Sequence, residues 1–270
     1  MLSGHPGLVA TTSPRFECLL DQSLQAVTFH PESPAGRWWA RDGVKPGPFV
    51  FSDPHQGQGG FGGSTAEFAG VWCLMRAAGR ADYQMTNEEA LLMWNDYRSL
   101  FPTKKPSGVD LVAQALGGLC EFGFEDKVAR TYLWDFEDFD FLIFRTGNKV
   151  KTHEHLDGLD LGDVSALGQI YGDFVQGLVE KDSAKVMAAV SAYRDDLDAR
   201  GWLARATKVL IAELQAADIA IKGCGALGAD TCAAFGPRDA IDGLVKRCLE
   251  RGLVCIARSG DLSEGLAISR

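Results

Sequence analysis

The residues best suited to chemistry in this chain form a glycine-dense turn, residues 59–63, that leads into a helix-forming segment. Glycine backbone can approach a phosphate closely and turn its N–H groups inward. A helix N-terminus adds unpaired N–H donors and a partial positive charge. The hydroxyl of Ser64 is also placed to meet a magnesium ion. The phosphate-binding residues that this pattern predicts are Gly60, Gly62, Gly63, Ser64 and Thr65. The alternative is a glycine-rich helix entry that serves turn geometry alone.

Two well-known nucleotide motifs do not fit this turn. A Walker A loop continues with Gly-Lys-Ser/Thr, and no lysine follows the glycines here. A dinucleotide fingerprint needs an acidic residue after a following strand, and none lies at the right distance. The turn therefore indicates a phosphate-binding loop of another kind.

A second segment combines a turn with a carboxylate. Residues 106–110 read Pro-Ser-Gly-Val-Asp, and a Gly-Gly pair follows at 117–118. Asp110 falls in the first turn of an expected helix, where the helix dipole favours its ionised form. A carboxylate held there can accept a proton from a substrate hydroxyl or orient that hydroxyl. The alternative is an ordinary acidic residue near a helix N-terminus.

A third glycine-rich turn follows an expected strand at 219–222. Gly225, Ala226 and Gly228 can let the backbone pass close to a ligand. Lys222 ends the strand and directly precedes the turn. On its own this pattern has little specificity.

Composition narrows the class of protein. A chain of 270 residues can bury a substantial core as one large or two small domains. Its net charge of −9 argues against a general nucleic-acid or anionic-membrane binder. No stretch is long and apolar enough for a membrane span, and no signal peptide is visible. The seven scattered cysteines predict reduced thiols in a cytoplasmic protein.

Strands and helices are expected in mixed order, which predicts an α+β fold. Thr86 and Glu89 form a capping-box pattern that starts a helix through Leu100. The segment 31–54 is rich in Gly, Pro and Trp and predicts loops and a short hairpin. A domain junction is expected at 147–149, which separates domains 1–148 and 149–270. The remaining expected strands are 8–10, 16–20, 119–122, 139–144, 219–222 and 253–257. The remaining expected helices are 64–80, 109–115, 164–180, 183–198, 202–217 and 237–250.

Taken together, the three motifs resemble those of the GHMP small-molecule kinases, with mevalonate kinase and phosphomevalonate kinase as the most similar members. The turn at 60–64 is similar to the family's ATP-phosphate loop, and 106–110 matches its Pro-Ser-Gly-x-Asp motif. The turn at 225–228 is similar to the third motif, after which the chain departs from the pattern. The resemblance implies a two-domain fold, with a ribosomal-protein-S5-like N-terminal domain and a ferredoxin-like C-terminal domain. It also implies ATP and Mg2+ as cofactors, Asp110 as a catalytic residue, and a cleft floor shaped by Gly225, Ala226 and Gly228.

Two departures from the family concern charged groups. The first family motif supplies a lysine and an acidic residue, and both are missing near the N-terminus of this chain. At the position of the family's magnesium-binding glutamate the chain has Ser99. Because phosphoryl transfer depends on neutralising charge, another cation is needed. Lys222 is the first candidate for this catalytic role and Lys149 the second; the alternative is that each is a solvated surface lysine.

The expected function is ATP-dependent phosphorylation of a small mevalonate-type acid or phosphate ester. The rival hypothesis is a protein of the same fold that binds a nucleotide or metabolite as a sensor or partner subunit, without transfer chemistry.

Trp38-Trp39 either stacks on an adenine or substrate, or forms a hairpin that packs in the core or against a second copy in a homodimer. His153 and His155 lack further metal ligands nearby, and Cys224 lacks a paired histidine.

Overall fold

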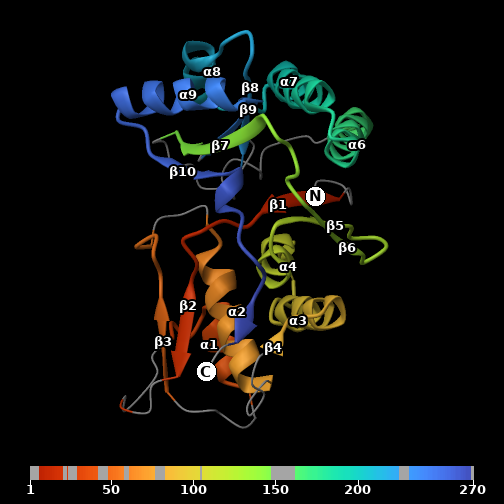
Figure 1. Ribbon diagram of the computed structural model, residues 1–270. Coiled ribbons are helices and arrows are strands. Elements are labelled where there is room, and N and C mark those ends of the chain that lie inside the picture. Colours follow the sequence, from red (N-terminus) through yellow and green to blue (C-terminus); the bar gives the residue numbers. More distant parts are fainter. Residues whose placement is uncertain are drawn as a thin grey trace. The chain divides into compact units, whose positions relative to one another are not determined.

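The computed structural model divides into two compact units (Figure 1). The first runs to Thr131 and includes the end of the chain from Leu262; the second comprises Tyr132–Asp261. This division falls earlier than the expected junction at 147–149, because strand β7 (Phe139–Arg145) pairs with strands of the second unit. The described residues are 6–20, 23, 29–41, 48–57, 61–76, 83–103, 105–146, 162–224 and 231–268.

Three helices form the centre of the first unit: α2 (Gly63–Arg76), α3 (Asn87–Ser99) and α4 (Val109–Leu116). Their buried side chains include Phe68, Met93 and Leu111. Small sheets flank these helices, in the orders β1-β5-β6, β2-β3 and β11-β4. The strands are β1 (Gly7–Ala10), β2 (Glu17–Leu20), β3 (Phe49–Ser52), β4 (Tyr83–Gln84), β5 (Leu119–Phe122), β6 (Ala129–Tyr132) and β11 (Ala267–Ile268).

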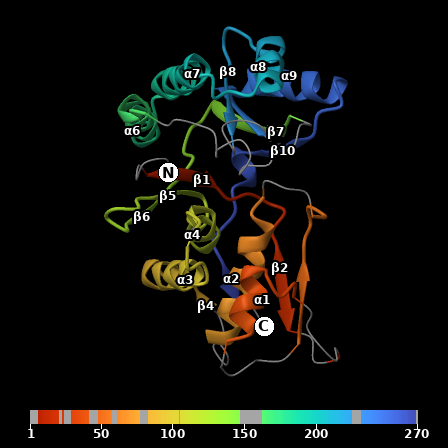
Figure 2. The ribbon, with the colours of Figure 1, turned by 180° about the vertical axis from the view of Figure 1, so that it is seen from behind.

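Local signals explain how the helices of this unit begin. The expected capping box is confirmed: the Thr86 side chain accepts a hydrogen bond from the Glu89 backbone N–H, and the Glu89 carboxylate accepts one from the Thr86 N–H. The expected hairpin at Trp38-Trp39 is wrong. Those residues lie in a helix, α1 (Pro34–Trp39), which Ser33 caps by accepting from Gly36 N at 3.0 Å. Figure 2 shows α1 against α2, with β2 beside the same helix.

The last segment of the chain returns to the first unit and crosses the C-terminal end of α4. Gly118 N donates to Ser263 O at 2.8 Å, and Leu266 N donates to Ala115 O at 2.9 Å. Gly117 has a φ of +81°, and a Cβ there would clash with the backbone of Gly265. The Gly-Gly pair after α4 therefore makes room for a chain crossing.

The second unit is a four-stranded antiparallel sheet in the order β10-β7-β9-β8. Helix α9 lies against β7 and β9, and α8 lies against β8 (Figure 1). Helix α7 also packs on β8, and α6 packs on α7. Strand β9 lies at the centre of the sheet, where no strand was expected. The remaining elements are α6 (Ser165–Glu180), α7 (Ser183–Ala199), α8 (Arg205–Leu214), β8 (Ala220–Cys224), β9 (Thr231–Pro237), α9 (Arg238–Glu250), β10 (Cys255–Arg258) and the 3-10 turn η2 (Ser259–Asp261).

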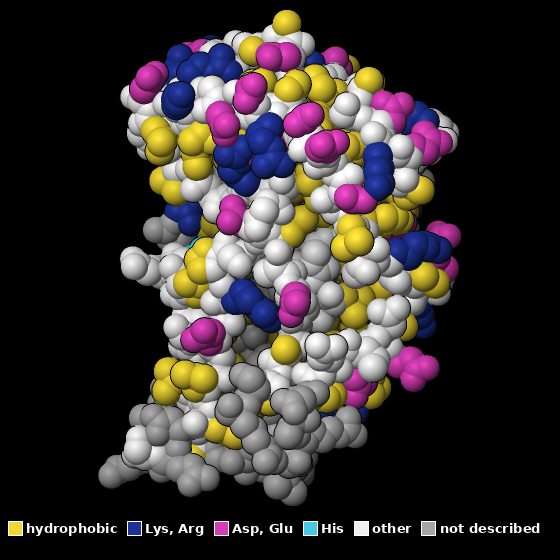
Figure 3. All heavy atoms as spheres, in the orientation of Figure 1, with side chains coloured by type: hydrophobic (Ala, Val, Ile, Leu, Met, Phe, Trp, Pro, Cys, Tyr) yellow, Lys and Arg dark blue, Asp and Glu magenta, His cyan; other side chains and the backbone are white. Residues whose placement is uncertain are grey.

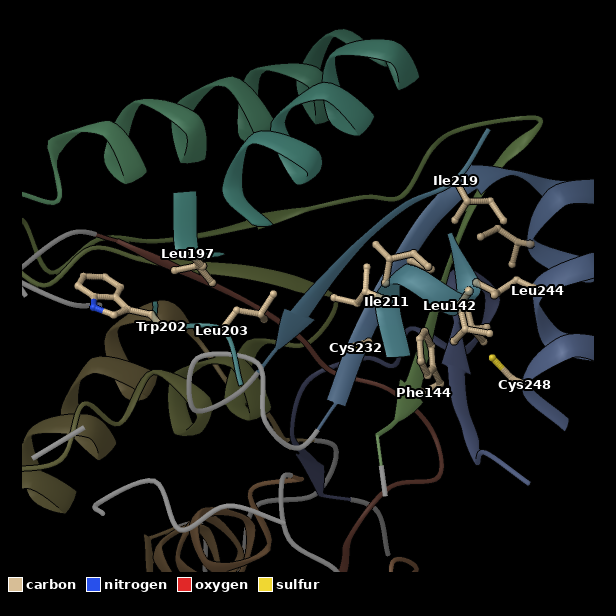
Figure 4. Packing of buried hydrophobic residues seen from close by; sticks show 14 of the residues in the cluster. Leu142, Phe144, Leu197, Trp202, Leu203, Ile211, Ile219, Cys232, Leu244 and Cys248 are labelled. Carbon is tan, nitrogen blue, oxygen red and sulfur yellow. The ribbon is translucent and has the colours of Figure 1, made fainter. Parts of the chain in front are cut away.

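An apolar core fixes this sheet against its helices. Figure 4 shows Leu142 and Phe144 of β7 near Leu244 and Cys248 of α9. All four side chains are fully buried. Ile221 of β8 joins the same core, so that its neighbour Lys222 lies on the opposite side of the strand.

An ion-pair network surrounds one buried carboxylate of the second unit. Buried Asp140 accepts hydrogen bonds from Arg258 Nη2 at 2.6 Å and from Ser259 N at 3.1 Å, and Arg258 also bonds Asp242 at 2.6 Å. Figure 3 shows acidic and basic side chains interspersed over one face of the molecule. Within the described ranges, no helix has the length and apolar character of a membrane span.

Candidate functional site

The glycine turn enters α2 through a conformation that favours glycine. Gly62 has a φ of +72°, in the left-handed region. A Cβ at this position would lie 2.6 Å from Gln114 Nε2, 3.0 Å from Thr65 Oγ1 and 3.6 Å from Asp110 Oδ2. The turn, the start of α2 and the acidic residue of the second motif therefore meet at one point.

The first turn of α2 presents free donors. Among the described residues, the backbone N–H groups of Gly62, Gly63, Ser64 and Thr65 donate no hydrogen bond. Such groups, together with the helix dipole, attract an anion. The Ser64 side chain is exposed, so its hydroxyl remains available to a ligand.

Thr65 serves a different purpose from Ser64. Its side chain is only 4% exposed. The hydroxyl lies 2.7 Å from Gly62 O and 3.0 Å from Asp110 Oδ2. Because one hydroxyl proton is shared between these two acceptors, Thr65 links α2 to Asp110 and offers its hydroxyl less freely than Ser64 does.

Asp110 lies in the first turn of α4, as its motif predicts. The helix begins after Gly108, whose φ is +68°. A Cβ at Gly108 would lie 2.9 Å from Trp94 Cδ1, so the glycine leaves room for this ring. Trp94 Nε1 donates to Ser107 O at 2.7 Å and so holds the turn in place. Burial raises the pKa of Asp110 above its ordinary value, and hydrogen bonds from Thr65 and the Leu111 backbone oppose this shift. A carboxylate with a raised pKa is suited to accept a proton.

Sequence reasoning missed Gln114, which lies one helical turn after Asp110. Its Nε2 donates to Gly62 O at 3.0 Å and to Phe61 O at 3.4 Å. The i, i+4 spacing from Asp110 places both side chains on one face of α4, and that spacing could have identified it. Gln114 therefore connects the glycine turn to the helix that carries Asp110.

An aromatic cluster lies beside the same turn and was also missed. The rings of His55 and Phe61 stack with centroids 4.0 Å apart and planes at 6°. Phe16 packs edge-on against His55 and stacks on Phe51. Phe16 is also the nearest side chain to the Cβ position of Gly63, at 3.6 Å. Flat side chains therefore border the start of α2.

Lys222, the second expected catalytic residue, lies in the second unit on β8. Its Nζ lies 3.5 Å from Cys224 Sγ and 5.0 Å from the centre of the Tyr193 ring. Burial disfavours the ammonium form, but the Cys224 sulfur and the Tyr193 oxygen outweigh it and raise the Lys222 pKa. The two side chains around it favour the charged form of Lys222 in the middle of β8.

Several other expected residues can be located. Ser99 donates to Asp96 O at 2.6 Å and accepts from Arg41 at 3.0 Å. The described part of the chain holds no cluster of three or more His, Cys, Asp or Glu side chains that could hold a metal ion. Ser64, whose side chain is exposed, stays the predicted magnesium contact. Outside the described residues lie Gly60, Gly225, Ala226, Gly228, Lys149, His153 and His155.

Comparison with known proteins finds similar structures but no similar sequences. The sequence matches no protein-family model and no curated protein. The structure of phosphomevalonate kinase from Streptococcus pneumoniae is similar with a TM-score of 0.70 at 13% identity, over 94% of this chain and 92% of that one. The same enzyme in complex with phosphomevalonate and AMPPNP gives 0.68 at 13% identity, over 94% and 93%.

A mevalonate kinase is similar as well. The enzyme from Methanococcus jannaschii matches with a TM-score of 0.60 at 13% identity, over 78% of this chain and 67% of that one. These likenesses span both units of the chain and agree with the expected α+β architecture. This chain has the fold of the GHMP small-molecule kinases.

Proposed function

We propose that this protein is an ATP-dependent small-molecule kinase that transfers the γ-phosphoryl group to a hydroxyl or phosphate of a small mevalonate-type acid. One observation carries the proposal. Asp110 and the free N–H groups at the start of α2 are 45 residues apart in sequence, yet Thr65 bonds Asp110 at 3.0 Å. An anion site and a carboxylate base therefore lie side by side.

Each part of this site has a role in the proposed reaction. The backbone from Gly62 to Thr65 holds phosphate oxygens, and the exposed Ser64 hydroxyl meets magnesium, which neutralises phosphate charge when bound. Asp110 accepts the proton of the acceptor hydroxyl or orients it. The aromatic cluster at Phe61 and His55 offers a flat surface on which a base can stack.

A second candidate function is nucleotide or metabolite binding without transfer. It is favoured by the missing N-terminal lysine and by Ser99, which stands in place of a magnesium-binding glutamate. Losing one group that stabilises charge in the transition state costs roughly 2.7–4 kcal/mol, a hundred- to a thousandfold in rate. Loss of two such groups would leave binding intact while turnover falls below detection.

One experiment separates these functions. Turnover of ATP with magnesium is measured against a panel of mevalonate-type hydroxy acids and their phosphate esters, beside a calorimetric titration with ADP and ATP. Binding with turnover supports the kinase, and binding without turnover supports the second candidate. Gly62→Val should abolish the nucleotide-induced rise in melting temperature, because a β-branched residue is strained at φ +72°. An unchanged wild-type melting curve at saturating nucleotide contradicts both functions.

A further inference from the structure

Gln114 is the polar side chain whose contacts the proposed chemistry does not yet use. It lies one turn after Asp110 on α4, and its amide nitrogen reaches the carbonyl oxygens of Gly62 and Phe61. The approach is close, because a Cβ at Gly62 would lie 2.6 Å from Nε2. The amide therefore touches the two peptide units that precede α2.

The orientation of this amide is fixed by its neighbours. With the group turned over, Gln114 Oε1 would face two carbonyl oxygens. In the observed orientation Oε1 is buried and has no hydrogen-bond partner among the described residues. An unpaired buried acceptor destabilises the fold, and an apolar side chain of similar size would avoid this cost. The favourable contribution of this amide therefore lies in its two N–H donors.

Those donors contribute to the direction in which the peptide units face, beside the Ala66 N–H and the Thr65 hydroxyl, which bond Gly62 O at 2.9 Å and 2.7 Å. In a trans peptide the C=O and N–H groups point in opposite directions. Drawing the carbonyls of Phe61 and Gly62 toward Gln114 turns the following N–H groups, those of Gly62 and Gly63, away from α4. These are two of the N–H groups that donate no hydrogen bond among the described residues. A pair of outward N–H groups forms a concave anion site.

We infer that Gln114 is a positioning residue that holds the N–H groups of Gly62 and Gly63 toward the phosphates of a bound nucleotide. This inference rests on the proposed nucleotide binding. Because Gln114 shares a helix face with Asp110, it also fixes the distance between the phosphates and the base. Without its donors, the Gly62 carbonyl still accepts from the Ala66 N–H and the Thr65 hydroxyl, but the turn loses its bonds to Gln114, and the N–H groups of Gly62 and Gly63 align less closely with the phosphates.

The test compares three variants in the full-length protein. Gln114→Met removes both donors and the unpaired acceptor at similar volume, and Gln114→Glu removes the donors at nearly identical shape. Gln84→Met makes the same chemical change at an exposed position of the first unit. Affinity for ADP with magnesium is measured by calorimetry, and melting temperature is measured without nucleotide.

Gln114→Met and Gln114→Glu should each weaken binding at least tenfold, whereas Gln84→Met should leave it unchanged. Gln114→Met should keep its melting temperature, so a purely structural role would not produce the same pattern. In wild type, the amide NMR resonances of Gly62 and Gly63 should shift on adding ADP, and in Gln114→Met these shifts should shrink. Wild-type affinity in both Gln114 variants overturns the inference and leaves the proposed function standing. Absence of binding in wild type overturns the proposed function itself.

Discussion

Asp140 of the second unit is buried and Asp110 of the first unit is partly buried, and the two carboxylates have different surroundings. In the second unit, Asp140 is 2% exposed and receives two hydrogen bonds from Arg258 and two from backbone N–H groups. These partners lower its pKa against the effect of burial. In the first unit, Asp110 accepts a hydrogen bond from the Thr65 hydroxyl and contacts the backbone; no cation pairs with it among the described residues, and burial raises its pKa. The ion-paired carboxylate contributes to stability, whereas the raised pKa of Asp110 suits the role of proton acceptor that we propose for it.

The largest expected effect concerns Asp110, the proposed base. Asp110→Asn should lower turnover by a hundred- to ten-thousandfold, the range for a general base, while affinity for ADP stays near wild type. The same variant should melt at a higher temperature at neutral pH, because it removes a poorly solvated charge. Steady-state kinetics, calorimetry and thermal melts test this together. Wild-type turnover in Asp110→Asn would show that the carboxylate does not take part.

Loss of the cation beside Asp140 should lower stability. Arg258→Met leaves Asp140 buried with only backbone partners, so the free energy of unfolding should fall by about 3 kcal/mol. Arg251→Met is the matched control, since the Arg251–Glu213 pair is 46% exposed on each side and should contribute less than about 1 kcal/mol. Urea denaturation of both variants gives the two values. Equal losses would mean that burial does not distinguish these ion pairs.

The two carboxylates should also differ in how they respond to pH. The folded-state pKa of Asp140 is lowered from its ordinary value of 3.8, so its contribution to stability is present above pH 3.8 and is lost as the pH falls further. The folded-state pKa of Asp110 is raised, so its charge costs stability as the pH rises from 3.8 through that raised value. Denaturation of Asp140→Asn and Asp110→Asn against pH should give difference curves of opposite slope. Parallel curves would refute the assigned pKa directions.

The smallest expected effect concerns the cation that the first motif lacks. If Lys222 contacts the transferred phosphoryl group, Lys222→Met should lower the single-turnover rate at least tenfold, about 1.4 kcal/mol in barrier height. Lys208→Met, which removes an exposed ion pair with Asp198, serves as the control. If Lys222→Met turns over at the wild-type rate, Lys149 is the next candidate. A wild-type rate in both Lys222→Met and Lys149→Met would mean that neither lysine supplies the charge.

Features with a local chemical cause were predictable from sequence. The capping box at Thr86 and the turn before Asp110 depend on side chains a few residues apart, and the structure places both as expected. Helix α1 was missed because a segment rich in Gly, Pro and Trp hid the Ser33 cap. Strand β9 was missed because its small residues, among them Ala233 and Ala234, carry no strand-like alternation and are buried by tertiary packing alone.

In the candidate site, the sequence predicted only the residues that belong to recognisable glycine-containing motifs. Gly62 and Asp110 belong to motifs whose spacing is visible, and they do meet in space. Gln114 has no motif, because a single buried amide gains its meaning only from the carbonyls of a turn more than fifty residues earlier. The aromatic cluster of Phe16, His55 and Phe61 likewise comes from separate segments and forms only on folding.

The crossing of Gly117 and Gly265 sets an order of events during synthesis. The segment that bonds Ala115, Gly118 and Thr11 is made after all of the second unit. A ribosome adds about 5–20 residues per second, so α4 waits on the order of ten seconds for its last partner. During that interval the helix that carries Asp110 lacks these hydrogen bonds. The nascent first unit therefore lacks these hydrogen bonds until the segment from Leu262 has emerged, and a chain released before then would leave the C-terminal end of α4 without them.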